Sequence, residues 1–260
     1  MHCFSPLVFV ASVVAAASCQ SFDQAQRPAP KTYWYENIKH NGISPFIPNG
    51  HNWTVFRNVK DFGAKGDGVT DDYLAFQAAV QYGNETADRR SHSFGTTGQP
   101  AVLYIPSGTY MLSFPIQSFV DTVIMGDPID PPVLRATENF SIPFLWYAKD
   151  PNFDATINFY IAMKNLVLDS TLVPPEQDIT LLDWSVSQAV QLTNVVFNMP
   201  IGATGHKGLA TPEGGSPLIM NDLTFQGGSV GIVMNEQQYH FKGITFKSQS
   251  TRGLVVGQPN

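Results

Sequence analysis

The sequence predicts an all-β solenoid, because one strand pattern returns along the second half of the chain at a nearly fixed phase. The pattern is an apolar–x–apolar triplet that follows a polar residue or a glycine. Its copies are Leu166–Leu168, Val195–Phe197, Leu223–Phe225 and Ile244–Phe246, after Asn165, Asn194, Asp222 and Gly243. Recurrence at roughly 20 to 30 residues is typical of stacked coils. We expect the first residue of every triplet to stack in one shared core.

Composition and a second repeat support the same fold class. Gly231-Ile-Val returns as Gly253-Leu-Val, and the chain contains 21 Gly and 19 Pro, which favours short strands and many turns over a helical bundle. A hydrophobic content of 43% is enough for a large core. Only 14% of the residues are charged and the net charge is −6, so the composition does not indicate a basic surface for nucleic acid or anionic lipid.

The stretch Asn58–Val80 predicts a short strand, a glycine-rich turn and a helix over about Asp71–Tyr82. Thr70 is placed to cap this helix, and acidic residues suit its first turn. Its apolar stripe is expected to contain Leu74, Ala75, Ala78 and Ala79. Strands are expected next at Ala101–Ile105, Tyr110–Leu112 and Thr122–Met125.

The first 50 residues divide into two segments. Residues 1–19 have an apolar core followed by small residues and predict a secretory signal peptide. Residues 20–50 are rich in proline and aromatics and predict an extended arm that docks on the solenoid, with a disordered linker as the alternative. Both cysteines, Cys3 and Cys19, lie in the predicted signal segment, so residues 51–260 must be held by their core. Sequons at Asn52, Asn84 and Asn139 predict a secreted, extracellular glycoprotein.

Three blocks in the first half carry a resemblance to a known superfamily. They are FRNVKDFGAKGDGVTDD, AVLYIPSGTYMLSFPI and DTVIMGDP. In this order they resemble the opening of the pectate-lyase-like superfamily of single-stranded right-handed parallel β-helices, which implies that the helix caps the first coil. With YWYENIKHNGISPFIPN and EGGSPLIMNDLTFQGGSVGIVMNEQQYHFKGITFKS, nearly the whole mature chain is similar to the N-terminal β-helix of glycoside hydrolase family 55.

That resemblance implies a secreted, inverting exo-β-1,3-glucanase without a cofactor. Members of the family carry two β-helices, and their essential acid lies in the second one. We therefore expect this chain to be truncated at its C-terminus, to need that missing domain as a partner, and to have little activity alone. One departure is Glu236-Gln237-Gln238-Tyr239, where the family commonly has Asn-Gln-Gln-aromatic.

Candidate site residues lie in and around the repeats. Inversion needs an acid and a base roughly 6.5 to 9.5 Å apart. Acidic candidates are Asp169, Asp178, Asp183, Glu213, Asp222 and Glu236. We favour Glu213, which lies in the predicted loop TPEGGS, and Glu236, which lies at a predicted coil corner, because both are well placed for a cleft. Gln237, Gln238 and Tyr239 are suited to binding sugar hydroxyls or orienting a water, with an internal amide ladder as the alternative. His206 in the predicted loop Gly202–Gly215 is a further sugar or acid–base candidate, although an exposed loop histidine is the simpler interpretation.

Other interpretations stay open at this point. Trp146, Trp184 or Phe241 could stack on a pyranose ring, although most such aromatics belong to cores. Asp67, Asp71 and Asp72 resemble half of a calcium loop but lack its final glutamate, so no metal is predicted. The chain lacks the Asn-Thr-Asp, Gly-His-Gly and Arg-Ile-Lys motifs of polygalacturonases. The alternatives to a glucanase are a non-catalytic polysaccharide-binding or cell-wall protein, or a pectin-active lyase or hydrolase.

Overall fold

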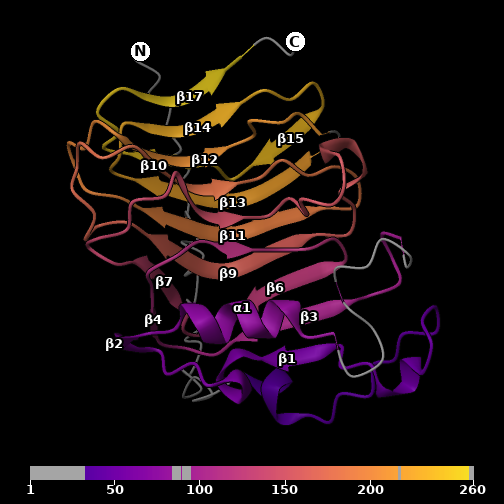
Figure 1. Cartoon of the computed structure of the whole chain (residues 1–260). Coiled ribbons are helices and arrows are strands. Elements are labelled where there is room, and N and C mark those ends of the chain that lie inside the picture. The colour runs from indigo at the N-terminus through magenta and orange to yellow at the C-terminus, as the bar shows by residue number, and fades with distance from the viewer. Residues whose placement is uncertain (1–32, 84–88, 90–94, 216–217, 258–260) are drawn as a thin grey trace, which may run out of the picture. The chain divides into compact units, whose positions relative to one another are not determined.

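A computed structural model describes residues 33–83, 89, 95–215 and 218–257 of the chain, and its strands form two parallel sheets (Figure 1). The predicted signal peptide, the first part of the predicted arm and the sequon at Asn84 lie outside the described residues. The signal peptide, the arm and their boundaries therefore stay predictions.

The larger sheet, sheet A, has eleven strands in the described residues, and every strand pair in it is parallel. Its main path contains β1 (Phe56–Asn58), β3 (Ala101–Ile105), β6 (Thr122–Gly126), β9 (Ala162–Asp169), β11 (Gln191–Asn198), β13 (Leu218–Gln226) and β15 (Tyr239–Lys242). Four further strands pair beside this path, namely β2 (Asp67–Asp71), β4 (Thr109–Leu112), β7 (Val133–Ala136) and β16 (Thr245–Lys247).

The smaller sheet, sheet B, contains six strands in the described part of the chain, again all parallel. They are β5 (Ile116–Gln117), β8 (Phe144–Tyr147), β10 (Ile179–Asp183), β12 (His206–Ala210), β14 (Val230–Met234) and β17 (Arg252–Val256). From β8 to β14 the chain alternates between sheet B and sheet A, so it winds as a parallel β-helix. The prediction of a solenoid with parallel coils is confirmed.

The polar residue before each repeated triplet is a corner of the coil. Asn165, Asn194 and Asp222 have φ values of 60°, 53° and 53°, and Gly243 has 67°. Such positive φ values bend the strand, and Asn, Asp and Gly tolerate them best. At this corner β9 passes from pairing with β6 to pairing with β7.

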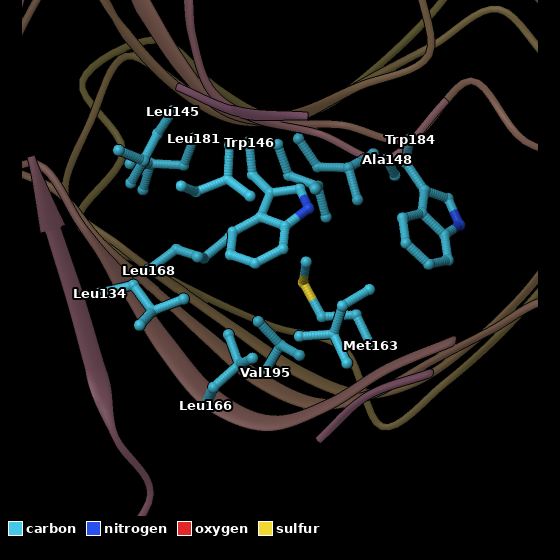
Figure 2. Packing of buried hydrophobic residues seen from close by; sticks show 14 of the residues in the cluster. Leu134, Leu145, Trp146, Ala148, Met163, Leu166, Leu168, Leu181, Trp184 and Val195 are labelled. Atoms are coloured by element: carbon cyan, nitrogen blue, oxygen red, sulfur yellow. The ribbon is translucent and has the colours of Figure 1, made fainter. Parts of the chain in front are cut away.

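The triplets themselves stack as predicted. Val195 pairs in register with Leu166 on one side and with Leu223 on the other, and all three are fully buried. Ile244 is half-buried and packs against the same core cluster. Figure 2 shows Leu166 and Val195 side by side in this interior, together with Trp146 and Met163.

A glycine column in sheet B makes room for a phenylalanine column in sheet A. Phe197, Phe225 and Phe246 stack with centroid distances of 4.4 and 5.3 Å. A Cβ on Gly208 would lie 2.5 Å from the Phe225 ring, and a Cβ on Gly231 would lie 2.5 Å from the Phe246 ring. The repeated glycines of the sequence are therefore positions of close packing between the two sheets.

The helix α1 (Tyr73–Gln81) forms at the predicted place but buries a different face. Leu74 is 76% exposed and Ala78 is exposed, while Phe76, Ala79 and Val80 are buried. The predicted stripe is right for Ala79, which is buried, and for Ala75, which packs against the core, but wrong for Leu74 and Ala78. The buried face is shifted because Phe76 turns inward against Tyr110 and Trp146. The predicted cap is also wrong, since the Thr70 hydroxyl donates to Asp67 and the N-cap residue is Asp72.

Short 3-10 helices accompany these elements. They are η1 (Trp34–Asn37), η2 (Gly50–Asn52), η3 (Val59–Phe62) and η5 (Ala155–Ile157). In the described part of the arm, the rings of Tyr33 and Tyr35 lie 6.4 and 6.3 Å from Tyr104 on β3. Trp34 and Phe46, by contrast, are exposed. This part of the arm therefore packs some of its aromatic rings on the β-helix and leaves others exposed.

Candidate functional site

Polar side chains gather where the strands of sheet B end. Tyr147, Asp183, Ala210 and Val233 occupy one register position on four neighbouring strands, so the segments that follow them leave from one edge. Five polar side chains occur at or soon after these positions in the sequence. We call Lys149, Asp183, Ser185, Glu213 and Glu236 the acidic ridge.

Glu213 is the exposed carboxylate of the acidic ridge. Its side chain is 59% exposed, and its Oε2 atom lies 2.6 Å from Nζ of Lys149. Its backbone N–H donates to Oγ of Ser185 at 3.0 Å. Since such exposed ion pairs contribute little stability, this arrangement orients the carboxylate more than it stabilises the fold.

Asp183 lies near Glu213 and is buried. Its Oδ1 atom accepts the backbone N–H of Ser185 at 3.0 Å. Burial raises the pKa of Asp183, the bonds from Ser185 lower it, and the charge of nearby Glu213 raises it further. The carboxyl group of Asp183 therefore keeps its proton to a higher pH than an ordinary aspartate, which is a property that acid–base sites use.

Glu236 is only 3% exposed. Its Oε1 atom accepts the backbone N–H of Gly215, and its Oε2 atom has no hydrogen-bond partner among the described residues. Burial raises the pKa of this carboxyl to about 7, although the bond from Gly215 opposes the shift. Glu236 therefore keeps its proton to a much higher pH than an ordinary glutamate, and it ties its own segment to the segment that carries Glu213.

Gln237, Gln238 and Tyr239 follow Glu236 directly and are all exposed. Tyr239 begins β15, and its ring lies 4.9 Å from the ring of Phe241. The amide ladder that the structure does show lies elsewhere, where Asn194 Nδ2 donates to Asn165 Oδ1 at 3.0 Å. The cluster is accessible to a ligand beside the acidic ridge, and its predicted role in sugar binding stays a prediction.

His206 does not lie in an exposed loop. It begins β12 and is fully buried, with Nδ1 2.9 Å from Ser170 Oγ and Nε2 2.8 Å from the Pro174 carbonyl oxygen. Burial lowers its pKa. The loop prediction for Gly202–Gly215 is wrong because a sheet B strand runs through it. With both ring nitrogens bonded inside, His206 has no free atom for a sugar in this arrangement.

The remaining acidic candidates have structural partners. Asp222 is a corner residue, Asp169 accepts from Arg135 and Asn198 at 3.0 Å each, and Asp178 pairs with Lys207 at 2.6 Å. Asp67, Asp71 and Asp72 accept nearby backbone N–H groups. Within the described ranges no group of three or more His, Cys, Asp or Glu side chains could hold a metal ion.

Neither tryptophan can stack on a sugar. Trp146 and Trp184 are fully buried and lie among the core side chains (Figure 2). Phe241 is half-buried and contacts exposed Tyr239, so it is the one platform candidate that keeps some accessible surface.

The sequence alone missed Lys149 and Ser185. Neither belongs to a motif, and the strands β8 and β10 that place them were not predicted. Knowing that Tyr147 and Asp183 share one register position would have pointed to the residues after them.

The sequons at Asn52 and Asn139 are exposed. A helix that combines enough length and enough apolar character to cross a bilayer does not occur in the described part of the chain.

Comparison with known proteins relates most of this chain to one family. The family model for "Rhamnogalacturonase A/epimerase, pectate lyase-like" matches residues 56–259. Among curated proteins, "Probable glucan endo-1,3-beta-glucosidase" of Arthroderma benhamiae is 34% identical and aligns with 94% of this chain and 29% of its own length.

Two further relatives are each 36% identical to this chain. "Glucan 1,3-beta-glucosidase" of Cochliobolus carbonum aligns with 86% of the chain and 29% of its own length. "Non-secreted LysM effector LysM19" of Penicillium expansum aligns with 85% of the chain and 18% of its own length. The chain thus spans less than a third of the length of these relatives.

Proposed function

This chain belongs to the rhamnogalacturonase A/epimerase, pectate lyase-like family, and from that premise we propose that it is a polysaccharide-binding β-helix of a β-1,3-glucan hydrolase. Two relatives that align with most of the chain are named glucan glucosidases, which supports the substrate class. The observation that carries the proposal is the acidic ridge, where the exposed carboxylate of Glu213 pairs with Lys149, and the exposed amides of Gln237 and Gln238 directly follow Glu236.

We assign sugar contact to Glu213, Gln237, Gln238 and Tyr239. All four are exposed, and carboxylate and amide groups bind the vicinal hydroxyls of a glucose ring well. Glu236 is a positioning residue in this proposal, because its buried carboxyl holds the Gly215 amide and so fixes the segment that carries Glu213.

Inversion at an anomeric carbon requires an acid on one face of the sugar and a base with a water on the other. Glu213 is ion-paired with Lys149 and suits the base, or a group that orients the water, better than the acid. We propose that the acid comes from a second β-helix domain of the kind that the resemblance to family 55 implies. Alone, this chain would then form one wall of the cleft and turn over little substrate.

Binding and turnover separate this proposal from its rivals. We expect the purified chain to bind insoluble β-1,3-glucan in a pull-down and to release little or no glucose from laminarin. Cellulose, a β-1,4-glucan, is the matched control. Rapid glucose release would show that both carboxyl groups are on this chain, and absence of glucan binding would contradict the proposed substrate.

A pectin-active function is the second candidate, because the family description names a rhamnogalacturonase. The same pull-down with rhamnogalacturonan tests it. If the chain prefers that polymer to β-1,3-glucan, the proposed substrate class is wrong. The assignment of the acidic ridge as the binding site would then be tested with rhamnogalacturonan instead.

We also propose that the chain is secreted and N-glycosylated. The apolar segment within residues 1–19 and the exposed sequons at Asn52 and Asn139 support this, whereas one relative is named as non-secreted. Expression of the full chain in a eukaryotic host should release it into the medium with a new N-terminus near Cys19. A glycosidase that removes N-glycans should then increase its gel mobility. Retention of the intact N-terminus inside the cell would contradict secretion.

A further inference from the structure

The described part of the arm forms a pocket together with the segment that leads into β1. Its volume of about 640 Å³ lies within the usual range of ligand-binding pockets, about 300 to 1,000 Å³. Its lining residues lie within the ranges 36–43 and 51–56. We call it the arm pocket.

The arm pocket lies at a sequon. Asn52, the acceptor of the sequon Asn52-Trp53-Thr54, is exposed and is one of the lining residues. Trp53, by contrast, is buried, and its Nε1 atom donates to the carbonyl oxygen of Pro100 at 2.7 Å. A glycan on Asn52 would therefore begin at the pocket, next to a residue that is anchored on the β-helix.

The walls of the arm pocket include apolar surfaces that suit the face of a pyranose ring. His40 and Phe56 both line the pocket, and their rings stack with centroids 3.6 Å apart and an interplanar angle of 6°. Ile38 and Ile43 also line it and are 45% and 53% exposed. A sugar in the pocket would cover these aliphatic side chains, which is favourable because it removes apolar surface from water.

Polar side chains complete the lining. Glu36, Asn41 and His51 offer carboxylate, amide and imidazole groups, which can form hydrogen bonds with the hydroxyl and acetamido groups of a sugar. N-acetylglucosamine, the first sugar of an N-glycan, has such polar groups as well as an apolar acetamido methyl group. The mixed lining of the arm pocket matches this mixture.

The residues around the pocket have a small core of their own. Ile47 and Trp53 are buried together, and half-buried Val55 packs against them. The hydroxyl of Ser44 donates to the carbonyl oxygen of Gly98. Since so small a core contributes little stability, a sugar that contacts both lining segments should make this region open less often.

We propose that the arm pocket holds the first N-acetylglucosamine of a glycan on Asn52. This inference rests on the N-glycosylation proposed above. In that reaction Nδ2 of Asn52 bonds to C1 of the sugar, the lipid diphosphate of the donor leaves, and the amide releases one proton. The sugar stays tethered, so its effective concentration at the pocket is about millimolar, and modest contacts are enough to hold it there.

Hydrogen exchange of the full chain, secreted from a eukaryotic host, tests the proposal. The backbone N–H groups of Ser44 and Trp53 both donate to the carbonyl oxygen of Gly50, so their exchange reports opening of this region. We expect exchange about fivefold slower than in Thr54→Ala, which removes the sequon and keeps Asn52. Thr54→Ser keeps the sequon and is the matched control. Enzymatic trimming of the glycan to its first sugar should preserve the slow exchange.

A second variant separates contact with the pocket from the presence of the glycan. Ile38→Ser combined with Ile43→Ser changes two exposed side chains and keeps the sequon, so circular dichroism should show an unchanged fold. Adding Thr54→Ala to this variant should then have little further effect on exchange. Ser141→Ala removes the sequon at Asn139 and should leave exchange at the arm pocket unchanged.

The outcomes distinguish this proposal from the one on which it rests. A mass spectrum that shows no glycan on Asn52 would overturn both. A glycosylated Asn52 without slower exchange, or slower exchange that survives the loss of both isoleucines, would overturn the placement in the pocket alone. Slower exchange of Thr54→Ala on addition of laminari-oligosaccharides would assign the pocket to free glucan and would also overturn this proposal.

Discussion

The corner of sheet A and the acidic ridge at the end of sheet B occur on the same coils but treat polar groups in opposite ways. At the corner, Asn194 donates to Asn165 of the adjacent coil, so polar groups satisfy one another. At the acidic ridge, Glu236 has a buried oxygen without a partner in the described part of the chain, and burial raises the pKa values of Glu236 and Asp183. A solenoid repeats its backbone but need not repeat its chemistry. Buried polar side chains that lack hydrogen-bond partners or have shifted pKa values are the better candidates for function.

Both regions depend on the packing between the two sheets. A substitution that disrupts this packing should reduce the stability of the protein more than any other change considered below. In Gly231→Val the new Cβ would lie 2.5 Å from the Phe246 ring and 2.6 Å from the Gly253 carbonyl oxygen. We expect a loss of about 3 kcal/mol in the free energy of unfolding, measured by urea denaturation. Val230→Ala, at a half-buried position of the same strand, is the control and should cost under about 1 kcal/mol. Equal losses would show that the glycine column is not a packing constraint.

The next largest loss of stability is expected from a substitution at the corner of sheet A. Asn194→Val places a β-branched residue at a φ of 53° and removes the bond to Asn165, which should cost about 2 kcal/mol. Asn194→Gly keeps the backbone conformation and should cost less than about 1 kcal/mol. Glucan binding should be unchanged in both variants. A weakened glucan affinity with an intact fold would mean that the corner belongs to the binding surface.

The acidic ridge should make the stability of the protein depend on pH through Glu236. The folded pKa of Glu236 is about 7, above its usual value of 4.5, so its protonated form stabilises the fold at low pH. This contribution is complete below pH 4.5 and is lost as the pH rises through 7. Wild type should therefore gain about 1 kcal/mol relative to Glu236→Gln between pH 8 and pH 5, a value that allows for solvent screening. Parallel pH profiles of the two proteins would contradict a buried, proton-holding carboxyl.

The smallest stability effect is expected at Glu213. Glu213→Gln breaks an exposed ion pair with Lys149 and should change stability by less than about 0.5 kcal/mol. Affinity for β-1,3-glucan should nevertheless fall about tenfold, because a hydrogen bond to a charged group is lost. Glu138→Gln, at another exposed position, is the matched control. Unchanged glucan affinity in Glu213→Gln would remove Glu213 from the proposed site.

The repeat could be predicted because it depends on short sequence patterns that recur along the chain. The phase of the apolar triplets, the corner residues before them and the two glycine–aliphatic repeats all reappear as stacked columns. The buried face of α1 could not be predicted from composition. Several faces of α1 carry apolar residues, and Phe76 was selected by the space beside Tyr110 and Trp146.

The candidate site shows the same limit. Glu213 and Glu236 were identified as candidate acids, but Lys149 and Ser185 were missed because they are 64 and 28 residues away from Glu213 along the chain. His206 was misplaced for a related reason. A short strand between two glycine-rich segments carries too few residues for its alternation to be recognised, and only pairing with β10 and β14 establishes it.

The sequence by itself determined that this chain coils and which residues stack, because those features follow from the period of its apolar residues. Only the tertiary structure decided which acidic side chains are buried, exposed or paired. A carboxyl group acquires its chemistry from neighbours one coil away, and the sequence does not record which coil lies beside it.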